Sequence, residues 1–346
     1  MAFFNTRITR LIVEITDSKM VNRYEHVDIA RGIAIILVVM GHSCSSSTGD
    51  LNRMILGFHM PLFFFLSGLF AKEYTHETLW RGVVKKMRRI LLPQVLLSFT
   101  VIIMKGIPWV MNGNSIWDFD LLNCFGYWFL PTLFFVSVLY MTLSLFVNFG
   151  ALRTKIITLF ITLVMVGLTL YAIDIPNGFL SKYIKLVPVA FLFYFSGSCL
   201  KKYVILEKGN KFQGVLLLIL APLMYVITQW NTPVKMYLSD YGRFPLFLLS
   251  SFMGIILVSF GSKHIKNFGI LRDFGEMSIA VYVWNFLVVA ATKSISLRLL
   301  KMVGLYTTGA HAAITFLISI CVLYAVCKIS LKKLPVVYGI KNDATS

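Results

Sequence analysis

Ten long apolar segments constrain this chain more than any other feature of its sequence. A helix needs about 20 residues to cross the hydrocarbon core of a bilayer, and segments of that order recur along the 346 residues. Hydrophobic residues make up 58% of the chain and charged residues 14%, against about 25% charged residues in an ordinary soluble protein. The sequence therefore predicts an all-α, polytopic integral membrane helix bundle of about ten transmembrane helices. The expected spans lie near 29–47, 54–71, 89–108, 127–147, 156–172, 184–200, 212–229, 244–260, 277–292 and 311–329.

The chain is strongly basic, with 33 lysines and arginines against 15 acids and a formal net charge of +18. In a soluble protein this balance would favour nucleic acid as a partner, but no aromatic and basic platform for it occurs outside the apolar segments. Most of the cations fall in alternate connecting segments, which is typical of the cytoplasmic loops of membrane proteins. We therefore expect a multi-pass protein of the inner, cytoplasmic membrane, with both termini in the cytoplasm and no nucleic acid partner.

The expected domain organisation is simple. A cytoplasmic N-terminal segment covers residues 1–28, one transmembrane domain covers 29–329, and a cytoplasmic tail covers 330–346. The last outside loop, with three cations from residue 293 to residue 301, fits the charge rule worst. It could be amphipathic and lie on the membrane surface.

The first apolar segment carries ionisable residues at both ends. Arg31 and His42 are eleven residues apart, which on a helix places them roughly 20° apart on one face and about 16 Å apart along the axis. Asp28 precedes Arg31 by three residues, so the two side chains can pair. Ionisable residues within a span usually line a cavity or a pathway. The alternative is that Arg31 anchors the cytoplasmic interface and His42 lies in the outer headgroup region.

Two further stretches add to this polar set. His59 lies in the second apolar segment, and Pro61 two residues later removes a helical hydrogen bond, which can open the backbone to a ligand. The stretch "RGVVKKMRRILLPQ", residues 81–94, brings Arg88 and Arg89 to the start of the third segment. This basic run could dock the phosphates of a donor, or it could anchor the chain to anionic membrane lipids.

These residue types suggest a division of labour. An imidazole is the usual general base for activating a hydroxyl, and a guanidinium grips phosphates or carboxylates. An arginine near the cytoplasmic face and a histidine deeper in the bundle would suit a phosphorylated cytoplasmic donor and a hydroxyl acceptor from the far side. No GxSxG, HExxH, P-loop or helix-opening GxGxxG motif occurs. The six scattered histidines and five cysteines show no metal-ligand spacing, so no metal site is predicted.

The motifs together resemble the acyltransferase 3 family of membrane acyltransferases, and most closely its branch similar to fucose 4-O-acetyltransferases. The first helix of that family carries an arginine, ten residues and a histidine, which Arg31 and His42 match. The stretch "FHMPLFFFLSG", residues 58–68, resembles the second family motif and is the most specific match. The stretches "RRILLP" at 88–93 and "YWFLPTLF" at 127–134 resemble the starts of its third and fourth helices.

The resemblance implies transfer of an acyl group, usually acetyl, from cytoplasmic acyl-CoA to a hydroxyl on a cell-envelope glycan or lipid-linked sugar. It implies that His42 is the base or a transient acyl carrier, and that Arg31 binds the donor. We expect His59 to position the acceptor or stabilise charge, and Asp28 to hold Arg31. The expected catalytic residues are thus His42, Arg31, Asp28 and His59, and the expected residues for acetyl-CoA as co-substrate are Arg31, Arg88 and Arg89.

Two rival interpretations remain open from the sequence. A transporter or flippase for a lipid-linked glycan would also need polar residues in a bundle, although no corresponding halves with paired broken helices are visible. A non-catalytic membrane interaction subunit would leave the clustered arginine and histidines without a role. The late stretch "MSIAVYVWNF" has Asn285 where the family commonly has a histidine, which puts a catalytic role for that position in doubt.

Overall fold

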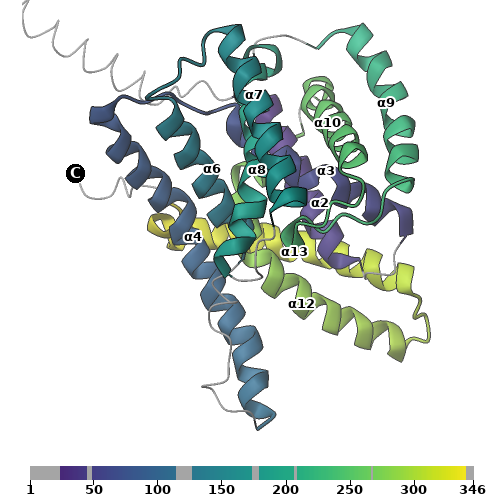
Figure 1. Ribbon diagram of the computed structural model, residues 1–346. Coiled ribbons are helices and arrows are strands. Elements are labelled where there is room, and N and C mark those ends of the chain that lie inside the picture. Colours follow the sequence, from purple (N-terminus) through teal and green to yellow (C-terminus); the bar gives the residue numbers. More distant parts are fainter. Residues whose placement is uncertain are drawn as a thin grey trace, which may run out of the picture.

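Each of the ten expected segments corresponds in large part to a helix. The computed structural model describes residues 24–44, 49–113, 127–173, 179–205, 209–265 and 268–339. Within these residues the regular structure is helical apart from one isolated bridge between Lys235 and Asp240. The long helices (Figure 1) are α2 (Glu25–Ser43), α3 (Gly49–Gly68), α4 (His76–Met111), α6 (Phe129–Leu143), α7 (Leu152–Gly167), α8 (Phe179–Ile205), α9 (Lys211–Gln229), α10 (Phe244–Gly261), α12 (Ser278–Met302) and α13 (Thr308–Lys333).

Seven helices of the described chain are long and apolar enough to cross a membrane. These are α2, α4, α7 with the π-helical turn η2 (Leu168–Ala172) that continues it, α8, α10, α12 and α13. Helices α6 and α9 are apolar but shorter, and α3 is buried in the middle of the others. The all-helical membrane fold is therefore confirmed, while the number of spans and the side on which the termini lie stay predictions.

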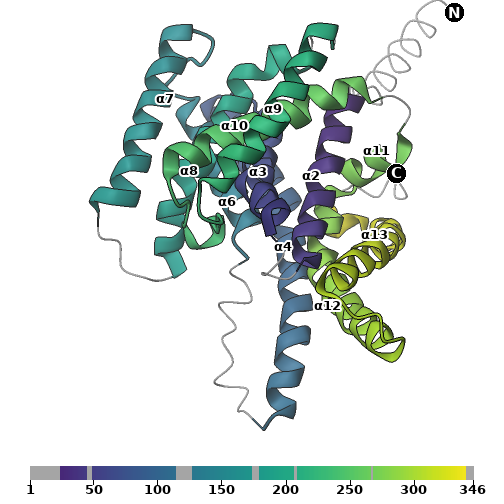
Figure 2. The same ribbon diagram turned by 90° about the vertical axis from the view of Figure 1, so that its right-hand side faces the viewer.

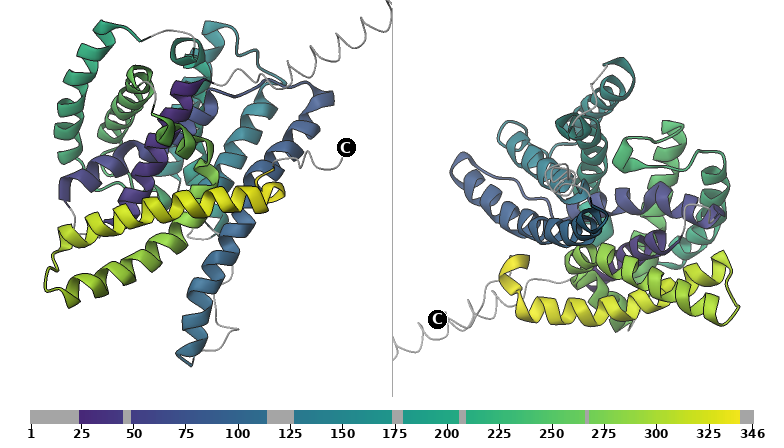
Figure 3. Two further views of the ribbon diagram at one scale, coloured as in Figure 1. Left: turned by 180° about the vertical axis from the view of Figure 1, so that it is seen from behind. Right: turned by 90° about the horizontal axis from the view of Figure 1, so that it is seen from below.

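The helix boundaries differ most from the expected spans at two places. Helix α4 begins at His76, well before the expected start near 89, because the basic run continues the helix instead of preceding it. Helix α12 continues to Met302, so the three cations assigned to an outside loop lie on a helix. Helices α12 and α13 pack side by side and run across the other helices, and α4 extends beyond the rest of the bundle (Figures 1 and 3).

Helix α3 forms the centre of the bundle. Nearly every residue from Phe58 to Leu66 is buried, and α3 packs against α2, α8, α9 and α10. A helix that is apolar on all sides must be covered on all sides. Helix α3 is therefore surrounded by other helices, and α2 is one of them. The two helices run in opposite directions, because a short connection joins the end of α2 to the start of α3. The start of α2 therefore lies beside the end of α3.

Two pairs of helices cross so closely that only glycine fits. A Cβ at Gly68 of α3 would overlap the carbonyl of Tyr194 in α8, and one at Gly197 of α8 would overlap the carbonyl of Phe65. The short helix α11 (Gly269–Glu276) lies against α2 in the same way (Figure 2). Small residues at such crossings let helix backbones pack closely in a membrane, where no hydrophobic effect drives the helices together.

The α2–α11 crossing has two reciprocal glycines. A Cβ at Gly32 would overlap the carbonyl of Leu271, and one at Gly275 would overlap the carbonyl of Asp28. We expect Gly32→Ala to lower the free energy of unfolding by about 1–3 kcal/mol, because backbone atoms must move apart to admit a methyl group. The measurement is the thermal unfolding midpoint of the purified protein in detergent.

The matched control for this prediction is Gly41 on the same helix. A Cβ at Gly41 would make an ordinary contact, 3.7 Å from the side-chain oxygen of Asn52. Gly41→Ala should therefore leave the midpoint unchanged or raise it slightly, since alanine is the better helix former. Equal midpoints for the two variants would contradict the close crossing.

Pro61 leaves a carbonyl of α3 without its helical donor, and a neighbouring helix supplies one. Proline has no N–H, so the carbonyl of Gly57 four residues earlier loses its usual bond. Ser251 of α10 donates its hydroxyl to that carbonyl at 2.7 Å, and Ser251 is fully buried. The expectation that Pro61 opens the helix to a ligand is therefore wrong for this carbonyl, which the protein itself satisfies.

This bond predicts a difference between two adjacent buried serines. Ser251→Ala should lower the free energy of unfolding by about 1–3 kcal/mol, because a buried carbonyl loses its donor. Ser250 is also buried, but its hydroxyl donates to Phe247 of its own helix. Ser250→Ala should cost clearly less, and chemical denaturation of both variants in detergent measures the difference. A larger loss for Ser250→Ala would contradict this account of the Pro61 site.

Candidate active site

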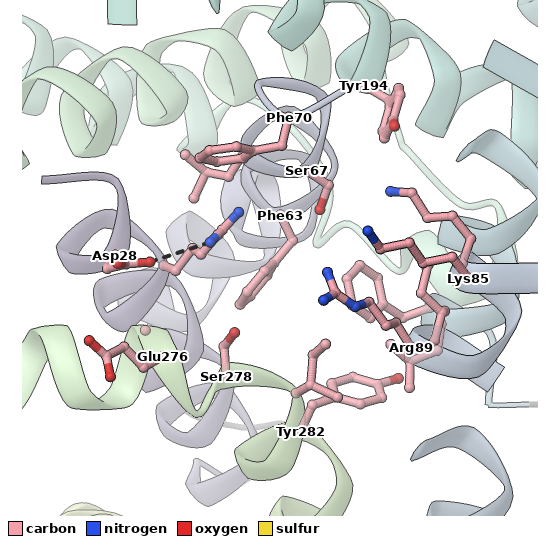
Figure 4. A pocket seen from close by; sticks show the side chains of 18 of the residues that line it. Asp28, Phe63, Ser67, Phe70, Lys85, Arg89, Tyr194, Glu276, Ser278 and Tyr282 are labelled. Carbon is pink, nitrogen blue, oxygen red and sulfur yellow. Dashed lines mark hydrogen bonds and ion pairs between the residues drawn. The ribbon is translucent and has the colours of Figure 1, made fainter. Parts of the chain in front are cut away.

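A cavity of about 800 Å³ opens where α2 begins and α3 ends. Side chains from α2, α3, α4, α6, α8, α11 and α12 line it, together with residues from the loop after α3 (Figure 4). We call it the basic pocket, because five cations and only two acids line it. The cations are Arg31, Lys72, Lys85, Lys86 and Arg89, and the acids are Asp28 and Glu276.

Helix α4 supplies most of the positive charge in the basic pocket. Lys85 and Lys86 precede Arg89 by four and three residues, so the helical repeat brings all three to one side of α4. Lys85 and Arg89 lie on the side of the cavity opposite Asp28 (Figure 4). Three cations of like charge on one face repel one another, and an anionic ligand between them would relieve that repulsion.

Arg31 is held in place by an acid and an aromatic ring. Its Nη1 donates to Oδ1 of Asp28 at 3.3 Å, and the Asp28 side chain is only 7% exposed. The guanidinium also lies over the ring of Phe70, 4.7 Å from the ring centre. A cation above an aromatic face is attracted by the ring quadrupole. Arg31 therefore has a fixed position at the wall of the basic pocket.

The short helix α11 supports this wall from behind. Asp273 of α11 accepts hydrogen bonds from the hydroxyl of Tyr324 at 2.7 Å and from Nζ of Lys328 at 3.1 Å, both on α13. The Tyr324 bond and the nearby Lys328 charge hold the pKa of Asp273 below its ordinary value. Through the glycine crossing, α11 in turn fixes the backbone of Asp28.

The inner end of the basic pocket is apolar, and we call it the aromatic floor. It consists of Ile35 of α2, Phe63 of α3, Phe129 of α6 and Tyr282 of α12, all of which line the cavity. Phe129 is its centre, with ring centroids 5.6 Å from Phe63 and 5.2 Å from Tyr282. The pocket is thus cationic at one end and aromatic at the other, which suits an amphipathic ligand with an anionic head.

The two predicted histidines lie together, beyond the aromatic floor. His59 is 8% exposed, and its Nδ1 donates to the carbonyl of Ile55 at 2.7 Å. In the neutral ring this bond places the free lone pair on Nε2. His42 is accessible in the last turn of α2, close enough to His59 and to Lys293 for their charges to interact. Neither histidine lines the basic pocket.

The structure therefore divides the predicted site residues into two groups. Asp28, Arg31 and Arg89 meet in the basic pocket, and His42 and His59 form a histidine pair further along the same two helices. Arg88 is exposed and is not among the lining residues, so the structure brings only one of the two adjacent arginines to the cavity.

Sequence reasoning missed several lining residues. Lys85 and Lys86 belong to the basic run but were not selected, although their spacing from Arg89 on a helix would have indicated them. Phe70 had no such signal, since an aromatic residue in an apolar span is usually structural. Tyr282 is one of several polar side chains in the late apolar segment, and the sequence did not single it out. Asn285 is buried one turn after Tyr282, and its Oδ1 has no hydrogen-bond partner within the described part of the chain.

The bundle defines a multi-pass membrane protein with a cavity that cations and apolar side chains line. The family model of the acyltransferase 3 domain matches residues 24–328, which is most of the chain. The protein belongs to the acyltransferase 3 family and is a membrane acyltransferase. No curated protein and no solved structure matches the chain.

Proposed function

We propose that the protein transfers an acetyl group from cytoplasmic acetyl-CoA to a hydroxyl of a cell-envelope or exported polysaccharide sugar. The observation that carries this proposal is the arrangement along α2 and α3. A cationic pocket lies at one end of these helices, an aromatic floor follows, and a histidine pair lies beyond it. This order matches a donor with a phosphate-rich head and a reactive acyl end.

The basic pocket would hold the phosphates of the donor. Arg31 and Arg89 offer planar forks that suit phosphate oxygens, and Lys85 and Lys86 add charge on the same helix face. Asp28 would keep Arg31 oriented without neutralising the whole pocket, because five cations face two acids. The cationic end would face the cytoplasmic side of the inner membrane, so the pocket would open toward the compartment that supplies acyl-CoA.

The histidine pair would carry out the transfer. His42 takes the proton from the acceptor hydroxyl, and the oxygen attacks the carbonyl carbon of the thioester. A carbon–oxygen bond forms and the carbon–sulfur bond breaks. CoA leaves as a thiolate, which takes up the proton from the imidazolium, so the products are an ester and free CoA. His59, with Nδ1 bound to Ile55, offers Nε2 to hold a hydroxyl of the acceptor.

The accessible position of His42 suits an acceptor that arrives from the far side of the membrane. A sugar hydroxyl on a glycan or a lipid-linked sugar would meet His42 without entering the basic pocket. Similarity to the fucose 4-O-acetyltransferase-like branch favours acetyl and a sugar alcohol over other acyl groups and acceptors. Membrane lipids surround the spans and meet the exposed cations such as Arg88.

Label transfer tests the proposal. Everted membrane vesicles that contain the protein and the native glycan receive acetyl-CoA labelled in the acetyl group. We expect label in the glycan fraction, released by mild base as expected for an ester. Movement of unlabelled glycan across the membrane without any incorporation would instead support the transporter alternative and contradict the acyltransferase proposal.

A further inference from the structure

We propose that Phe63 sets the length of the acyl group that the protein accepts, because its ring closes the aromatic floor in front of His59. This inference rests on the proposed acyl-CoA donor. It identifies a residue that determines specificity at the end of the pocket opposite the cations.

Phe63 is the floor residue placed most directly between the pocket and the histidine pair. It follows His59 by four residues on α3, so the two side chains lie on one face of the helix, about 6 Å apart along its axis. Phe63 lines the cavity and His59 does not. The labelled ring of Phe63 reaches into the centre of the pocket (Figure 4).

Helix α2 has the same order of residues, first a cavity-lining apolar side chain and then a histidine. Ile35 lines the cavity, and His42 lies seven residues further along the same face, outside it. An acyl group that enters from the cationic end therefore meets Ile35 and Phe63 before either histidine. Both helices place an apolar side chain at the level where the cavity ends.

Within the floor, Phe129 is held by more neighbouring rings than Phe63 is. The Phe129 ring has four neighbouring rings among the described residues, those of Phe63, Phe64, Tyr282 and Trp128, with centroids at 5.6, 5.2, 5.2 and 6.0 Å. Phe63 has a ring contact with Phe129 only, within the described residues. Phe63 therefore lines the cavity at the floor without the several ring contacts that fix Phe129.

A pocket that binds the phosphates at one end and is closed by the aromatic floor at the other limits the length of the acyl group. The cations fix the phosphates, so each added methylene of the acyl chain must find room at the floor. Interiors are close-packed and resist added atoms. An apolar pocket discriminates one methylene by about 10- to 200-fold. The floor should therefore favour acetyl strongly over chains of four or six carbons.

The test compares acyl-CoA donors of increasing length with three proteins. These are the wild type, Phe63→Ala and the control Phe65→Leu, assayed in membranes for transfer of acetyl, butyryl and hexanoyl groups. Phe65 is fully buried on the same helix, but it does not line the cavity. Each donor is titrated, so that kcat/KM is obtained for every pair.

We expect the wild type to prefer acetyl over hexanoyl by at least about 100-fold. Phe63→Ala should reduce this preference at least tenfold, chiefly by raising kcat/KM for the longer donors. Phe65→Leu should leave the preference unchanged even where it lowers activity. The milder variant Phe63→Leu keeps a smaller apolar side chain at the floor and should shift the preference in the same direction. It replaces Phe63→Ala in the test if Phe63→Ala does not fold.

Two results would overturn this inference alone. One is acetyl transfer by folded Phe63 variants with the wild-type preference, and the other is an equal shift in Phe65→Leu. A wild type that uses all chain lengths equally would also overturn it. A wild type that transfers no acyl group from any CoA donor to its native glycan would instead refute the proposed function.

Discussion

His42→Ala is expected to lower acetyl transfer by about 100- to 10,000-fold, the usual contribution of a general base. His42 is accessible at the end of α2, next to His59, where no other described histidine lies on the same helix face. Loss of the imidazole leaves the acceptor hydroxyl protonated, so attack on the thioester slows. Because His42 does not line the basic pocket, the affinity for CoA should stay within about twofold.

The control for this variant is His76→Ala. His76 is exposed in the first turn of α4, and neither the basic pocket nor the histidine pair includes it. Its replacement should leave transfer unchanged. Normal transfer by folded His42→Ala, at protein levels matched by immunoblot, would remove the proposed base from the mechanism.

Arg89→Gln is expected to raise the KM for acetyl-CoA by about 10- to 100-fold, with little change in kcat at saturation. A charged hydrogen bond is worth about 1.5–3 kcal/mol, and about 1.4 kcal/mol corresponds to a tenfold change in affinity. Because the phosphates are bound alike before and during the reaction, the loss should fall on binding.

The neighbouring arginine provides the comparison for Arg89. Arg88 and Arg89 are both exposed, but only Arg89 lines the cavity, so Arg88→Gln should change KM by less than about twofold at physiological salt. The two variants remove the same charge from adjacent positions of one helix. Equal effects would mean that net charge on α4, and not the basic pocket, governs donor affinity.

The sequence predicted the helices well because long apolar segments leave few alternatives in a membrane. It placed the start of the third span near 89, since the apolar segment begins only at the end of the basic run. The structure instead has Pro93 inside α4. One missing hydrogen bond is tolerated in a long helix whose neighbours pack around it, so proline marked no boundary here.

The site was predictable only where one helix carried the pattern. Arg31 and Asp28 are neighbours on α2, and their pairing follows from a spacing of three residues. The aromatic floor joins Phe63, Phe129 and Tyr282 from three different helices. No spacing within the sequence brings such residues together, so their meeting depends on tertiary packing. The separation of the histidine pair from the basic pocket could not be predicted for the same reason.

The central claim is that the two ends of α2 have separate tasks, donor binding at the basic pocket and transfer at the histidine pair. The most direct measurement determines the Kd for CoA and the saturated transfer rate for two purified variants in parallel. We predict that His42→Ala binds CoA as the wild type does but transfers almost no acetyl, whereas Arg89→Gln binds CoA weakly but transfers at a near-normal saturated rate. Loss of CoA binding in folded His42→Ala, or unchanged CoA binding in Arg89→Gln, would contradict the account.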